Sequence, residues 1–132
     1  MLAAATRNQG ASPRADNAGE ALNDERPIDL VHLARQTDGD EQLEAELLAM
    51  FDRQAEKLTE RVKFTDLPRR ARADIAHRLR GSALAIGAGA VARAAEALEG
   101  SLERWRGEPE AEIEALSRAV AAARAAIGDL LG

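Results

Sequence analysis

The sequence predicts an all-α protein: an antiparallel up-down four-helix bundle with a short extra N-terminal helix. Three observations lead to this prediction. Apolar residues recur at steps of three and four in four long segments. The alternating pattern of a half-buried strand is missing along the chain. Short breaks rich in Gly, Pro or Asp separate the long segments, which places consecutive helices antiparallel.

The composition of the 132-residue chain fits a bundle. Two phenylalanines and one tryptophan are its only aromatic residues, so Leu, Ile, Val and Ala must fill the core. Cysteine is absent, which excludes disulfides and cysteine nucleophiles. No apolar run reaches the roughly 18 residues of a membrane span, and the first residues do not resemble a secretion signal. The net charge of −5 argues against nucleic acid and membrane as partners. With no span and no secretion signal, we expect a cytoplasmic protein. We expect a monomer, because the apolar faces can be satisfied within one bundle.

The chain divides into two parts. Residues 1–25 show no sustained apolar periodicity, and we expect a flexible tail there. Residues 26–132 are expected to form the bundle domain. A short first helix follows the tail, and its Leu30, Val31 and Leu33 are expected to lie over one end of the bundle.

Three of the four long helices are predicted over residues 41–63, 91–105 and 113–130. Asp40 precedes the first of them as a plausible N-cap. One face of this helix carries Leu43, Leu47, Phe51, Leu58 and Val62. Trp105 is expected to pack at the bundle end with its indole N–H in water.

The remaining long helix, over about residues 68–86, carries the candidate site. Thr65 or Asp66 is expected to cap its start. Gly87 and Gly89 provide the permissive backbone that ends a helix.

The direction of one histidine follows from the periodicity of this helix. At about 100° per residue, Ile75, Leu79, Ser82 and Ile86 form the buried stripe. His77 lies on the opposite face, so its imidazole is predicted to be in water. A satisfied core histidine, the ordinary alternative, does not fit this pattern.

The face around His77 is unusual for a solvated surface. Small and apolar residues gather there beside arginines, and Leu84, two turns on from His77, is expected to be exposed. Such a patch on a small domain favours a partner-binding surface. Its candidate partner-binding residues are Arg70, Ala73, Arg78, Leu84 and Ala88.

Two neighbours of His77 suggest a chemistry. Gly81, one turn on, costs about 1 kcal/mol inside a helix, and any side chain there would crowd the imidazole. Alternatively, Gly81 ends the helix or admits another helix closely. Arg80 is placed to pair with phosphoryl oxygens, and a neutral imidazole is a competent nucleophile near pH 7. Together His77, Arg80 and Gly81 describe a phosphoryl acceptor and donor.

The stretch "HRLRGSALAIGA" resembles the signature of the histidine-containing phosphotransfer (HPt) domain of multistep two-component phosphorelays. That pattern reads roughly His-x-Leu-Lys-Gly-Ser, followed by a short apolar stretch and Gly-Ala. The resemblance covers about residues 27–130. One departure is Arg80, where the family most often has lysine. The residues in register are His77, Leu79, Arg80, Gly81, Ser82, Gly87 and Ala88.

The resemblance implies a function. His77 would be phosphorylated, at Nε2, by the phosphoaspartate of a response-regulator receiver domain, and would pass the group to a second receiver. Receiver domains and a hybrid sensor histidine kinase are the implied partners. The receiver would supply its own Mg²⁺, so this chain is expected to need no metal, nucleotide or other cofactor of its own.

Other functions fit the sequence less well. A sensor-kinase dimerisation domain would show an acidic residue directly after the histidine, where Arg78 stands. A metal site lacks Cys or HExxH spacing, and His32 is expected to be a half-buried packing residue. A nucleic-acid module lacks interleaved aromatics around its arginines, which are Arg69, Arg70, Arg72, Arg78 and Arg80. The main alternative is a bundle of this fold that docks a receiver or kinase through the same face without phosphotransfer.

Overall fold

The computed structural model describes residues 26–132, so the tail predicted over residues 1–25 lies outside the described residues. The described part of the chain forms five helices and no strand. The helices are α2 (Leu30–Thr37), α3 (Glu41–Val62), α4 (Arg69–Ile86), α5 (Gly89–Arg104) and α6 (Glu110–Leu131). The predicted all-α class is confirmed, and each predicted long helix matches an observed one to within a turn.

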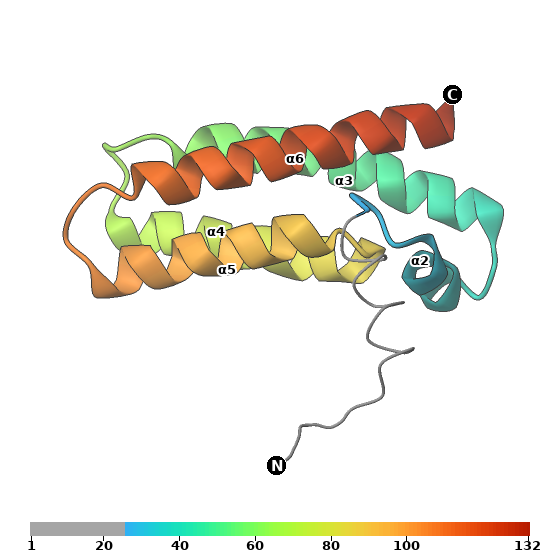
Figure 1. Ribbon diagram of the computed structural model, residues 1–132, viewed down its shortest axis with the longest axis horizontal. Coiled ribbons are helices and arrows are strands. Elements are labelled where there is room, and N and C mark those ends of the chain that lie inside the picture. Colours follow the sequence, from blue (N-terminus) through green and yellow to red (C-terminus); the bar gives the residue numbers. More distant parts are fainter. Residues whose placement is uncertain (1–25) are drawn as a thin grey trace, which may run out of the picture.

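Helices α3 to α6 form the bundle. Contacts join α3 to α4, α4 to α5, α5 to α6, and α6 back to α3. Figure 1 shows α3 beside α6 in one layer and α4 beside α5 in the other, with successive helices running in opposite directions. Helix α2 contacts α3 and α4 at one end of the bundle. Of the helices described, none is both long enough and apolar enough to cross a membrane.

The core is built from aliphatic side chains, as the composition predicts. Among the described residues, Phe51 is the only buried aromatic residue, with 2% of its surface exposed. Small side chains at helix contacts allow the helix axes to approach closely. Five alanines of the bundle helices are fully buried, with 0% of their surface exposed to solvent. They are Ala55, Ala76, Ala83, Ala95 and Ala123.

The helix starts follow the predicted caps in one case and not in the other. Asp40 caps α3, since its carboxylate accepts the backbone N–H of Leu43 at 3.1 Å. Helix α4 begins after Pro68 with no side-chain cap, so the expectation for Thr65 or Asp66 is wrong. These two residues lie within the turn closed by the hydrogen bond from Leu67 N–H to the Phe64 carbonyl. They are part of that turn and do not reach the first turn of the helix.

Helix α4 ends at Ile86, and its C-cap residue Gly87 contacts the segment before α2. Gly87 has a φ of +80°, the left-handed conformation predicted for it, whereas Gly89 begins α5 instead of ending α4. The Gly87 carbonyl accepts the N–H of Asp29 at 2.8 Å. A Cβ at position 87 would lie 2.8 Å from the Asp29 carbonyl oxygen, so both the backbone and this contact require glycine.

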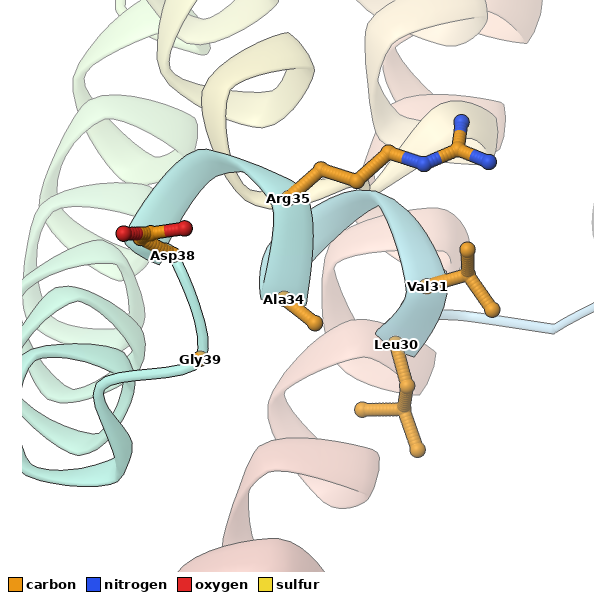
Figure 2. A pocket seen from close by; sticks show the side chains of 6 residues that line it. All are labelled: Leu30, Val31, Ala34, Arg35, Asp38 and Gly39. Carbon is orange, nitrogen blue, oxygen red and sulfur yellow. The ribbon is translucent and has the colours of Figure 1, made fainter.

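Helix α2 covers the bundle end with fewer residues than predicted. Leu33 is buried, but Leu30 and Val31 are 45% and 54% exposed, so the expectation is wrong for these two. A helix of two turns buries a single stripe, which Leu33 and Thr37 occupy. Figure 2 shows Leu30 and Val31 projecting from the first turn of α2. They line a shallow surface groove of about 560 Å³ with Ala34, Arg35, Asp38 and Gly39.

Two arginines of α4 hold the opposite end of the bundle. Arg72 is 2% exposed and donates to the Val62 carbonyl at 2.8 Å and to both carboxylate oxygens of Glu108 at 2.9 and 2.7 Å. The hydrogen bonds from Arg72 lower the pKa of Glu108. Arg69 donates to backbone carbonyls at the end of α5 and in the loop after it. These belong to Ser101, Leu102, Trp105, Arg106 and Gly107.

Candidate functional site

The structure places His77 in water, as the periodicity predicts. Its side chain is 63% exposed on the outer face of α4. The buried stripe of the same helix contains Ile75, Leu79 and Ile86, which are 6%, 0% and 3% exposed. Ser82, assigned to that stripe, is only half-buried. The face of α4 that carries the imidazole is therefore the predicted one.

Glu99 on α5 contacts this imidazole, and the sequence analysis did not identify it. His77 Nδ1 lies 3.3 and 3.2 Å from the two carboxylate oxygens of Glu99, whose side chain is 19% exposed. An ionised carboxylate only accepts hydrogen bonds, so a hydrogen bond from the ring to Glu99 requires the proton on Nδ1. In the neutral ring, the lone pair is then on Nε2. Glu99 thus contacts Nδ1 and leaves Nε2 without a partner in this pair.

Gly81 lies inside α4, which continues to Ile86, so it does not end the helix. A Cβ built at Gly81 meets no atom within 4 Å, so no neighbouring helix packs closely there. Both alternatives for this glycine are therefore wrong. The expectation that any side chain would crowd the imidazole also needs correction, because one methyl group would not reach it. Only a longer side chain at this position could extend over the ring.

Three arginines of α4 add positive charge near His77. Arg70 and Arg78 are exposed, and Arg80 is half-buried. Within residues 26–132, none of the three forms an ion pair. Their charges are therefore available to an anionic group that approaches α4 from outside.

The predicted docking face is smaller than expected. Leu84 is 51% exposed, as predicted. The expected exposure of Ala73 and Ala88 is wrong, because they are 5% and 0% exposed. Ala73 borders α5, where it shares a cleft with Leu102. Ala88 follows the left-handed turn at Gly87, so it no longer continues the periodicity of α4 and points into the core.

Two of the five clustered arginines have structural roles. Arg69 is bound to backbone carbonyls and Arg72 to Glu108, so neither side chain is available to a partner. Three of the five arginines are then left for the basic patch that a nucleic-acid module would need. Helical periodicity does not separate these two arginines from the other three, because only the neighbouring loops distinguish them.

The predicted burial is confirmed for His32 but not for Trp105. His32 is half-buried, as expected, and its Nε2 is buried without a hydrogen-bond partner. The expectation that Trp105 packs at the bundle end is wrong, because it is 60% exposed and follows the end of α5 with an extended backbone. No group of three His, Asp or Glu side chains in residues 26–132 is arranged to hold a metal ion.

No family model, curated protein or solved structure matches this chain. The likeness of "HRLRGSALAIGA" to the HPt signature thus remains a resemblance. What the fold adds to it is the pair formed by His77 and Glu99 on two adjacent helices.

Proposed function

We propose that this protein is a histidine phosphotransfer protein. It accepts a phosphoryl group on Nε2 of His77 from a receiver-domain phosphoaspartate and passes it to the aspartate of another receiver. The observation that carries the proposal is the contact of Nδ1 with Glu99, which leaves Nε2 of an exposed ring as the nucleophile. The HPt resemblance around His77 supplies the reaction class.

The transfer balances without a further reactant. The Nε2 lone pair attacks phosphorus, the bond from phosphorus to the aspartyl oxygen breaks, and the aspartate leaves as a carboxylate. The ring keeps its Nδ1 proton and becomes positively charged, and Glu99 stabilises that charge. Passing the group to a second receiver reverses these steps and restores the neutral imidazole.

Arg80 supplies positive charge for the phosphoryl oxygens during transfer. Phosphoryl transfer depends mainly on positioning and on charge stabilisation. Arginine in place of the usual lysine keeps the charge and adds a planar fork that can bind two oxygens. The receiver brings its aspartate and Mg²⁺, so this chain contributes no cofactor of its own.

The receiver-binding face consists of residues around His77 that an incoming protein can reach. Leu84 is the apolar contact, and Arg70 and Arg78 face the acidic surroundings of the receiver's metal site. Ala73 and Ala88 are removed from this face because they are buried. The protein acts as a cytoplasmic monomer that meets receivers or a hybrid sensor histidine kinase one at a time.

A transfer assay tests the proposal. Receiver domains from the same cell are phosphorylated and mixed with the wild-type protein, with His77→Gln, or with His32→Gln. The chain has two histidines, so His32→Gln is the matched control. Acid-labile, alkali-stable label should appear on the wild type and on the control, and phosphorus NMR should assign it to Nε2.

Two outcomes would contradict the proposal. Label retained by His77→Gln would place the phosphoryl group elsewhere. Receivers that bind the wild type without labelling it would favour the alternative, a module that docks and regulates a receiver or kinase without transfer.

A further inference from the structure

A groove on the outer surface of α3 is separate from the His77 site. It has a volume of about 560 Å³ and is lined by Glu56, Lys57, Glu60, Arg61 and Phe64. We call it the Phe64 groove. His77 pairs with α5, whereas this groove belongs to α3 and the start of the loop that follows it.

The two carboxylates of the groove each take part in an ion pair. Glu56 forms an ion pair with Arg124 of α6 at 3.1 Å, and Glu60 forms one with Lys63 at 3.0 Å. Each carboxylate therefore pairs with a cation at the border of the groove, although Arg124 also pairs with Asp52 at 2.8 Å.

The two cations of the groove have no such partner. Lys57 and Arg61 are exposed, lie one turn apart on α3, and form no ion pair within the part of the chain that the structure describes. The charge that the groove offers to an outside molecule is thus positive, although the whole chain carries a net charge of −5.

Phe64 gives the groove an apolar floor. Its side chain is 59% exposed, and it is one of only three aromatic residues in the chain. The backbone on both sides is held, since Phe64 N–H donates to the Arg61 carbonyl at 3.1 Å and Leu67 N–H to the Phe64 carbonyl at 3.2 Å. A large aromatic side chain on a fixed backbone beside a hollow is the usual anchor of a protein interface.

We propose that the Phe64 groove docks an acidic peptide segment of a partner protein. An apolar side chain of the segment packs on Phe64, and its carboxylates pair with Lys57 and Arg61. Nucleic acid fits less well, because two cations on a net acidic chain neutralise few phosphates. The proposal does not depend on phosphotransfer, since no residue of the groove belongs to the His77 site.

Fluorescence anisotropy with the full-length protein tests this proposal. The probe is a labelled short peptide with glutamates one helical turn apart and a central leucine. Arg61→Glu should weaken its binding by about tenfold, which corresponds to about 1.4 kcal/mol. The matched control is Arg118→Glu, which reverses one exposed arginine of α6 outside the groove. It should bind the probe as the wild type does.

A second pair of measurements separates packing from charge. Phe64→Ala should weaken the leucine peptide but bind an otherwise identical alanine peptide no more weakly than the wild type does. Since Phe64 is exposed, the variant should fold normally. The proposal fails if the wild type binds neither peptide, if both peptides bind it equally, or if Arg118→Glu weakens binding as much as Arg61→Glu. It also fails if duplex DNA, anionic vesicles or a second copy of the chain occupies the groove in preference to the peptide.

Discussion

The Nδ1 atom of His77 on α4 lies 3.2 Å from Oε2 of Glu99 on α5. The two residues are 22 positions apart in the chain, so their contact depends on the packing of the two helices against each other. A helix carrying the motif on its own would expose the same ring without selecting a nitrogen. The contact that distinguishes the two ring nitrogens is thus a property of the bundle.

Removing the carboxylate of Glu99 should slow phosphotransfer. A hydrogen bond to a charged group contributes about 1.5–3 kcal/mol, and the exposed ring puts this pair at the lower end. We expect Glu99→Ala to reduce the rate of label uptake by roughly tenfold, which corresponds to about 1.4 kcal/mol. Nitrogen NMR of the ring should also show that Nδ1–H is no longer the dominant tautomer.

The control for this experiment is Glu103→Ala, which removes a carboxylate one turn further along α5. It should change neither the tautomer nor the rate. A wild-type ring protonated mainly on Nε2 would contradict the assigned role of Glu99.

Substitutions at Gly81 should separate stability from access. A methyl group at this position meets no atom within 4 Å, so Gly81→Ala should stabilise the protein by up to about 1 kcal/mol and keep transfer active. Gly81→Gln should fold as well but block transfer, because its longer side chain can extend over the imidazole. Thermal melts and the transfer assay on both variants test this. Equal transfer rates for the two variants would remove the steric role of this glycine.

Replacing Leu84 with a charged residue should weaken the binding of a receiver but leave the stability of the fold nearly unchanged. The side chain is 51% exposed, so Leu84→Glu should change the free energy of unfolding by no more than about 0.5 kcal/mol. Affinity for a receiver, measured by calorimetry, should fall severalfold. Leu130→Glu replaces a leucine of α6 that is 46% exposed and should leave the affinity unchanged. Equal losses for both would point to general charge repulsion.

The ion pair of Arg72 and Glu108 should make stability depend on pH. The pKa of Glu108 lies below its ordinary value of 4.5, because Arg72 donates hydrogen bonds to the charged carboxylate. The pair therefore stabilises the fold above that value, and the contribution is lost as the pH falls through the lowered pKa. Glu108→Gln should cost about 2–3 kcal/mol near neutral pH, since it leaves the buried Arg72 without its counter-charge. Urea titrations should show this cost shrinking in acid, and a cost that stays constant would contradict the role of the pair.

Loss of the Arg69 side chain should loosen the loop after α5. Five carbonyls would lose a donor in Arg69→Ala, although the Ser101 carbonyl keeps the backbone N–H of Trp105, and we expect a destabilisation of about 2 kcal/mol. Trp105 is the only tryptophan and its carbonyl is one of the five, so its fluorescence should become easier to quench with acrylamide. Arg70→Ala, the adjacent exposed arginine, should leave quenching unchanged. The same quenching in both variants would show that Arg69 does not hold the loop.

Patterns within one helix were predictable from the sequence. The apolar period of α4 gave the exposure of His77 and Leu84, and the cap residue Asp40 and the left-handed Gly87 gave helix boundaries. These features depend on a few neighbouring residues, so local chemistry decides them.

Features that need two helices were not predictable. Whether Ala73 is buried depends on where α5 lies. A helical wheel gives the direction of a side chain around its own helix but does not show which other helix packs against it. For the same reason the sequence separated neither Arg69 nor Arg72 from the exposed arginines, and it did not identify Glu99. Each of these depends on the register between helices, which the apolar period alone leaves open.

Helix α4 is fastened at both of its ends. Arg69 in its first turn is bound to the loop after α5, and Gly87 after its last turn is bound to Asp29 before α2. The backbone that presents His77 therefore has little freedom left to lose when another protein settles on it. Association with such a surface carries a small ordering cost, so more of the contact energy remains as affinity for a protein that docks there.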